Sequence, residues 1–180
     1  MKEELSVLKA LALSCGFTHC TSLDISSVRL LEEVRQMCAQ NTCRQYGKTW
    51  CCPPGLGTLE ECEARIRSCR KGILLQTVGT LEDAFDVGSM QRIMDEHKSH
   101  FQIFRQKITP DHPGLLAIGS GGCSLCEKCT YPDRPCRYPE KACGSMEGYG
   151  MLVTEVCRQN GLGYYYGPGT LAYTSCILFP

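Results

Sequence analysis

The sequence lacks a surplus of either charge, a long apolar run and any paired histidine motif. Lysine plus arginine equals aspartate plus glutamate at 19 each, whereas proteins dedicated to nucleic acid usually have a basic surplus, so the balance argues against a nucleic-acid partner. No segment has the roughly 20 consecutive apolar residues that cross a bilayer, which argues against a membrane partner. The four histidines form no HExxH spacing. His97 falls on the apolar stripe of a predicted helix, where a hydrogen-bonded core histidine is the simpler interpretation.

Three motifs of nucleotide-binding and radical enzymes are also missing or incomplete. Gly47-Lys48-Thr49 matches only the end of a Walker A motif, because Thr42 stands where the first glycine is required. After Gly119 and Gly121, Ser124 occupies the position of the third glycine of GxGxxG. The CxxxCxxC order of enzymes that cleave S-adenosylmethionine is absent. None of these chemistries is therefore expected.

Cysteine is abundant, with 15 among 180 residues. Such a density indicates either a disulfide scaffold or metal ligation. The first 17 residues, MKEELSVLKALALSCGF, place two acids beside the first lysine and interrupt the apolar stretch with Lys9, so they predict an amphipathic helix and no signal peptide. We therefore expect a cytoplasmic protein, because in a reducing compartment cysteine clusters bind metal instead of forming disulfides.

The length suits a single domain over residues 1–180. We predict an α/β or α+β fold, in which helices flank a small central sheet of about four or five strands, with a cysteine-rich loop lobe from about residues 38–62 and 119–144. Apolar periodicity and capping residues predict helices that end at Gly16, begin near Ser26-Ser27, begin at Thr58, span Ser89 to Ile108, and begin at Ser145. Short apolar runs predict strands at 17–25, 73–78 and 115–118, and a closing hairpin of 162–166 with 170–179.

The clearest candidate metal site is the run CSLCEKCTYPDRPC. Thiolates two residues apart can turn onto one centre, and CxxCxxC opens the bacterial ferredoxin signature for a cubane iron–sulfur cluster. The fourth cysteine comes six residues later instead of three, but Pro132 and Pro135 in this gap let the loop fold back onto the same centre. Tetrahedral zinc is the alternative, although the two consecutive two-residue gaps fit a cluster better than a zinc ribbon. The predicted ligands are Cys123, Cys126, Cys129 and Cys136.

A second candidate site lies upstream, between the second and third predicted helices. Cys51 and Cys52 are adjacent and point in different directions, so we expect only one of them, Cys52 before Pro53, to bind. Cys62 either completes the ligand set or is a buried thiol on the apolar stripe of its helix. In the second case three thiolates would leave one iron open to a substrate or an external ligand. The predicted ligands are Cys38, Cys43, Cys52 and, subject to this alternative, Cys62.

The segments CRQYGKTWCCPP, LEECEARI and CSLCEKCTYPDRPCRYPEKACGSMEGYGM resemble the small family of predicted metal-binding, cysteine-rich proteins found mostly in anaerobic microbes. The resemblance runs from about Cys38 to the C-terminal strands. It implies an iron–sulfur protein and no particular reaction. It also implies ligand roles for the same eight cysteines, least securely for Cys62. Cys51 and Cys143 stand where other residue types are common in the family, so we expect neither to bind.

We therefore expect an iron–sulfur protein that holds two 4Fe-4S clusters and transfers electrons to a redox partner protein. One alternative is an enzyme whose open iron at the first cluster activates a small molecule or sulfur species, and another is a zinc-binding structural or interaction module. The basic residues among the cysteines are either solvated charges or docking groups for an acidic partner. These are Arg44, Lys48, Lys128, Arg134 and Arg137. The cysteines expected only to pack are Cys15, Cys20, Cys69, Cys157 and Cys176.

Overall fold

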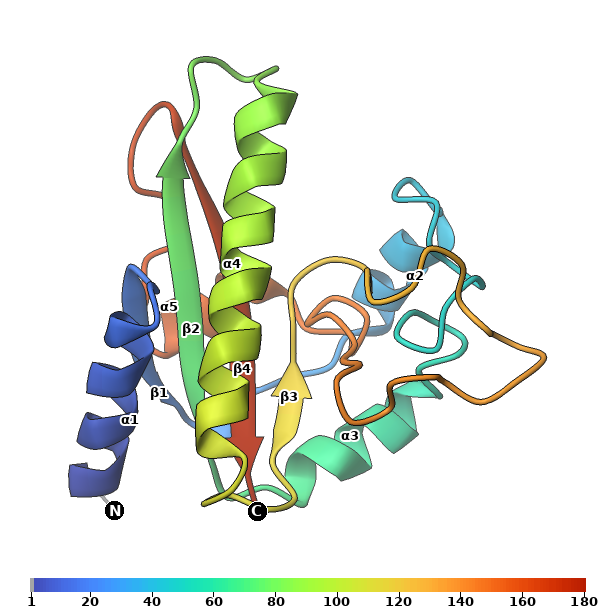
Figure 1. Cartoon of the computed structure of the whole chain (residues 1–180), viewed down its shortest axis with the longest axis horizontal. Coiled ribbons are helices and arrows are strands. Elements are labelled where there is room, and N and C mark those ends of the chain that lie inside the picture. The colour runs from blue at the N-terminus through green and yellow to red at the C-terminus, as the bar shows by residue number, and fades with distance from the viewer. Residues whose placement is uncertain (1) are drawn as a thin grey trace.

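The structure, a computed structural model, describes residues 2–180 and places one antiparallel sheet between two sets of helices (Figure 1). The strands lie in the order β1-β2-β4-β3. The predicted fold class and strand number are confirmed, and the antiparallel pairing places the fold on the α+β side of the expectation. The elements are α1 (Lys2–Ser14), β1 (His19–Leu23), the 3-10 helix η1 (Ile25–Ser27), α2 (Glu32–Ala39), α3 (Leu59–Arg67), β2 (Lys71–Thr80), α4 (Val87–Ile108), β3 (Leu116–Ile118), α5 (Val153–Gln159) and β4 (Thr170–Phe179).

The two long central strands supply a core on each face of the sheet, because alternate side chains point to opposite faces. Ile73 and Leu75 of β2 face α1 and α4, where they pack with Phe101 and Phe104. Leu74 lies on the opposite face, in the core that contains residues of α3 and α5. Both cores are therefore built on β2 and β4, whose ten residue pairs form the longest ladder of the sheet.

The helices with strong local signals form where the sequence predicts them. Thr58 accepts a hydrogen bond from the Glu61 backbone N–H, and the Glu61 carboxylate accepts one from the Thr58 N–H, which confirms the capping box of α3. In α4, His97 is fully buried and both ring nitrogens have partners: Nδ1 lies 3.0 Å from Thr77 Oγ1 and Nε2 lies 2.6 Å from Ser175 Oγ. The prediction of a hydrogen-bonded core histidine is confirmed.

The predicted starts of two helices are wrong. Residues Ile25–Ser27 form only a 3-10 turn, because the Asp24 carboxylate caps it and Arg67 donates to the carbonyls of Ile25 and Val28; α2 begins at Glu32. Ser145 caps no helix either. Its hydroxyl accepts from the Gly148 N–H in a turn, and α5 has its N-cap at Leu152, seven residues later than predicted.

The predicted hairpin at the C-terminus is also wrong, because residues 162–166 form no strand. The Tyr166 ring stacks on His19 with ring centroids 4.7 Å apart, and its hydroxyl donates to Gln76 Oε1. The Gln76 amide in turn donates to the Gly163 carbonyl. These side-chain contacts hold the segment against β1 and β2, and β4 pairs with β2 and β3 instead.

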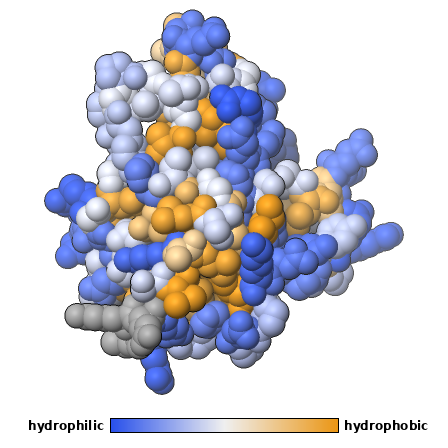
Figure 2. Space-filling model, turned by 60° about the vertical axis from the view of Figure 1, so that its left-hand side comes forward, coloured by the Kyte–Doolittle hydropathy of each residue, from blue (hydrophilic) through white to orange (hydrophobic). Residues whose placement is uncertain are grey.

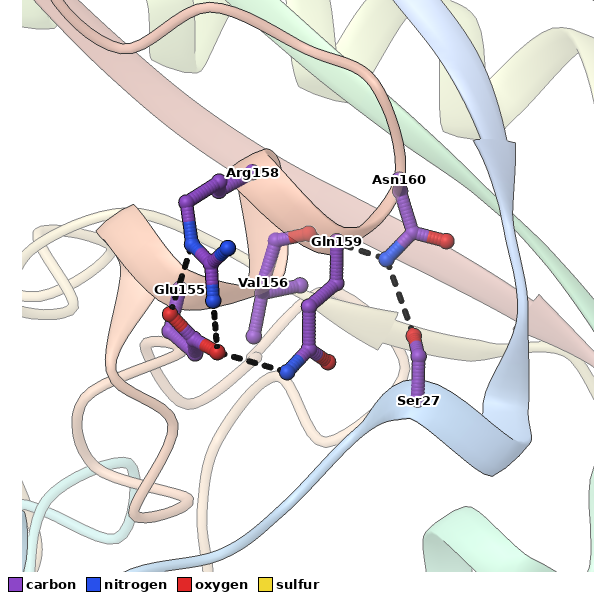
Figure 3. Close-up of polar contacts among 6 residues, drawn as sticks. All are labelled: Ser27, Glu155, Val156, Arg158, Gln159 and Asn160. Atoms are coloured by element: carbon purple, nitrogen blue, oxygen red, sulfur yellow. Dashed lines mark hydrogen bonds and ion pairs between the residues drawn. The ribbon is translucent and has the colours of Figure 1, made fainter.

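The predicted stop of the last helix at Asn160-Gly161 is confirmed, and Asn160 also ties α5 to the start of the chain. Its side-chain N–H groups donate to Ser27 Oγ and the Val156 carbonyl, both at 2.9 Å (Figure 3). Its carbonyl oxygen Oδ1 accepts from the Asp24 backbone N–H at 2.8 Å. The end of α5 is therefore fixed against η1.

Two cysteine-rich loops lie side by side beyond the β3 edge of the sheet, away from α1 and next to α2 (Figure 1). They are residues 40–58 and 119–144. The opposite side of the molecule carries apolar patches among hydrophilic ones (Figure 2). Between Lys2 and Pro180 no helix is long and apolar enough to span a bilayer.

Candidate metal centres

The upstream cysteines Cys38, Cys43 and Cys52 line a common cavity of about 310 Å³, here called the first cavity. Cys38 lies at the end of α2, and the chain then reverses through two residues with positive φ, Asn41 and Arg44. Burial raises the pKa of the Cys38 and Cys52 thiols, and the nearby Glu147 carboxylate raises that of Cys38 further. A bound metal stabilises the thiolate form, so it would offset part of the free-energy cost of ionising these buried thiols.

The downstream cysteines line a separate cavity of about 730 Å³, the second cavity. It contains all four residues predicted for that site, Cys123, Cys126, Cys129 and Cys136, and also Cys51. The loop is held by polar contacts from within and from α4. Arg137 Nη1 donates to the Lys128 carbonyl at 2.8 Å, and Lys98 Nζ donates to the Gly122 carbonyl at 2.9 Å.

Cys51 and Cys52 face different cavities, as their adjacency predicts. Cys51 lines the second cavity and Cys52 the first. The interaction between the neighbouring Cys51 and Cys123 thiols raises the pKa of Cys51 and lowers the pKa of Cys123. The sequence interpretation set Cys51 aside. The adjacency of Cys51 and Cys52 could have indicated a role for Cys51, because two neighbouring cysteines that point in different directions can each line a different site.

Cys62 is fully buried in the core beneath α3 and does not line the first cavity. Its sulfur lies 3.2 Å from Arg65 Nη2 and 3.9 Å from Arg35 Nη1. The structure thus brings together three of the four cysteines predicted for the first site. Cys143 is half-buried beside Gly119 and lines neither of the two cavities.

The donor set fits a metal that prefers sulfur. Three cysteines line the first cavity and five line the second, and soft thiolate ligands select zinc, copper(I) or iron–sulfur clusters. In the part of the chain from Lys2 to Pro180, no three His, Cys, Asp or Glu side chains are already arranged around a single ion position. The cysteines therefore share cavities without forming a closed tetrahedral site.

The fold and its two cysteine-lined cavities define a cysteine-rich α+β protein with two candidate metal centres. The chain belongs to the family described as predicted metal-binding protein (DUF2284), whose model matches residues 21–179. This match confirms the metal-binding, cysteine-rich family expected from the sequence. No curated protein and no solved structure matches the chain.

Proposed function

We propose that this chain is an iron–sulfur protein with two four-iron clusters, one serving electron transfer and the other presenting an open iron. Cys123, Cys126, Cys129 and Cys136 would hold the fully ligated cluster. Cys38, Cys43 and Cys52 would hold the other. When bound through three thiolates, such a cluster supplies a Lewis-acidic iron to a small molecule.

The number and spacing of the cysteines at the second cavity favour a cluster over zinc. A structural zinc ion takes four ligands, with each sulfur about 2.3 Å away. Here five cysteines line the cavity, and three of them follow the CxxCxxC spacing of cluster loops. A zinc-binding interaction module therefore remains the weaker alternative.

The observation that carries the open site is the position of Cys62. Its sulfur contacts Arg65 and the core, and Cys62 does not line the first cavity, as the three other cysteines do. Bringing Cys62 to a metal would remove a fully buried side chain from its packing, at a cost of about 1–3 kcal/mol. Three thiolates are thus the ligand set that the fold favours.

The pair Cys51-Cys52 supports an electron path between the two sites. Consecutive Cα atoms lie about 3.8 Å apart across a trans peptide, and these two residues line different cavities. The rim of the second cavity carries Arg44, Lys48, Lys128 and Arg137 against a single acid, Glu127. This charge would steer an acidic redox partner protein to that side.

The proposal includes a reducing, anaerobic cytoplasm. All 15 cysteines are free thiols, and such thiols persist where glutathione and thioredoxin systems keep them reduced. Cluster loss in air would follow from the exposure of Cys43 and the partial exposure of the six other proposed ligands.

Metal and sulfide analysis of anaerobically purified protein tests the proposal. We expect about eight iron and eight sulfide per chain, the content of two four-iron clusters. Cys52→Ala and Cys126→Ala should each lose about half of the iron, and their spectra should differ because different clusters are lost. Stoichiometric zinc in a colourless, iron-free protein would refute the proposal.

A further inference from the structure

The first cavity extends beyond its three cysteines to the helix and strand opposite. Met94 of α4 and Leu171 and Tyr173 of β4 line the far wall. Its volume of about 310 Å³ lies at the lower end of the range for small-molecule sites, and equals that of about ten water molecules. There is therefore room for a compact organic molecule next to Cys38, Cys43 and Cys52.

The charge around this cavity is negative. Among residues 2–180, Glu147 is the one charged residue that lines it, and its side chain is exposed at the rim. Its carboxylate acts across the space, since it contributes to the raised pKa values of both the Cys38 thiol and the Tyr164 phenol. No lysine or arginine in the described chain lines this cavity, in contrast to the four at the second cavity. Two cations bond to backbone carbonyls of this wall, Arg35 to Gly148 and Lys98 to Gly122. An anionic ligand would therefore find no counter-charge on the cavity surface itself.

Three polar side chains on the wall, those of Tyr173, Thr174 and Ser145, already have partners. The Tyr173 hydroxyl donates to the Met90 carbonyl at 3.3 Å, and the Thr174 hydroxyl accepts from Gln76 Nε2 at 3.1 Å. The Ser145 hydroxyl accepts from the Gly148 N–H. A ligand therefore meets mainly apolar surface, with the side chains of Gln45, Tyr46, Ser120 and Tyr164 as the remaining neutral polar groups.

We infer that the first cavity binds a small, mainly apolar organic molecule that is neutral or positively charged. The cavity excludes carboxylates and phosphates. The role of this molecule as a ligand of the open iron rests on the proposed function. The charge and shape of the first cavity do not depend on the proposed function.

Three probes of similar size and different charge test this inference: benzylamine, benzyl alcohol and benzoate. Their dissociation constants are measured by ligand-observed NMR on anaerobically purified protein at pH 7. We expect benzylamine and benzyl alcohol to bind at least tenfold more tightly than benzoate. Met94→Trp, which fills the cavity from α4, should abolish binding of all three. Glu147→Gln should reduce the preference for benzylamine over benzoate several-fold, whereas the control Glu127→Gln, at the second cavity, should leave it unchanged.

Iron content measured on the same samples separates the two proposals. A protein with full iron content that binds none of the probes, or binds benzoate as tightly as benzylamine, overturns the inference and leaves the proposed function standing. Unchanged binding by a folded Met94→Trp variant overturns it as well. A zinc-containing, iron-free protein that still prefers benzylamine supports the pocket and refutes the iron–sulfur function.

Discussion

His97 should make the stability of this protein strongly dependent on pH below neutrality. Its ring is fully buried between Thr77 and Ser175, and burial, together with His100 and Lys98, lowers its pKa to about 3. An unfolded chain returns the imidazole to water, where its pKa is about 6.5. The test compares how acidification changes the stability of the wild type and of His97→Gln, whose glutamine side chain does not titrate.

The sign follows from proton binding. Below pH 6.5 the unfolded chain binds a proton at His97 that the folded protein does not, so the free energy of unfolding falls as the pH falls. The contribution is fully present above about pH 6.5 and is lost progressively toward pH 3. The difference between a pKa of about 6.5 and one of about 3 lowers the free energy of unfolding by about 5 kcal/mol over that whole window. Between pH 7 and pH 5 the loss is about 2 kcal/mol.

Urea unfolding followed by far-UV circular dichroism at pH 7 and pH 5 measures this loss. The difference between wild type and His97→Gln removes the contribution of every other titrating group, the metal ligands included. We expect the wild type to lose about 2 kcal/mol more than the variant. Phe17→Leu, a change beside the ring, should lower stability equally at both pH values. Equal losses for wild type and His97→Gln would refute the reasoning.

Two further predictions concern stability. Thr58→Ala removes the hydroxyl that caps α3 and should cost about 1 kcal/mol, or about 2–4 °C in Tm by calorimetry; an unchanged Tm would count against the capping box. Gly16→Ala should cost at least about 2 kcal/mol, because φ is +106° and the new Cβ would meet the His100 ring. Gly161→Ala, at φ +69° with open space around it, should cost about 1 kcal/mol, and urea unfolding should rank the two in that order.

The parts of the fold that the sequence predicts correctly depend on local rules. The capping box of α3 and the apolar periodicity of α4 lie within single segments, and both form as expected. The start of α2 and the conformation of residues 162–166 depend instead on distant partners. Arg67 donates hydrogen bonds to the carbonyls of Ile25 and Val28, and Gln76 donates one to the carbonyl of Gly163. No local pattern encodes these contacts.

The candidate site shows the same division. Regular spacing placed Cys123, Cys126, Cys129 and Cys136 together, and the structure puts all four in one cavity. The far wall of the first cavity could not be predicted, because Met94 and Tyr173 share a cavity with Cys38 only in the folded protein, where α4 and β4 lie beside the loops. Whether Cys62 is a metal ligand or a buried thiol of the hydrophobic core likewise depends on the tertiary structure.

The iron content of Cys62→Ala most directly tests the central claim that three cysteines hold the first cluster. Cys157→Ala, another fully buried thiol of the same core, controls for the lost packing, and Cys52→Ala controls for the loss of a ligand. We expect Cys62→Ala to retain the iron and sulfide of the wild type, as Cys157→Ala does. A selective loss of about four iron atoms from Cys62→Ala, equal to that from Cys52→Ala, would contradict the account and make the first cluster fully ligated.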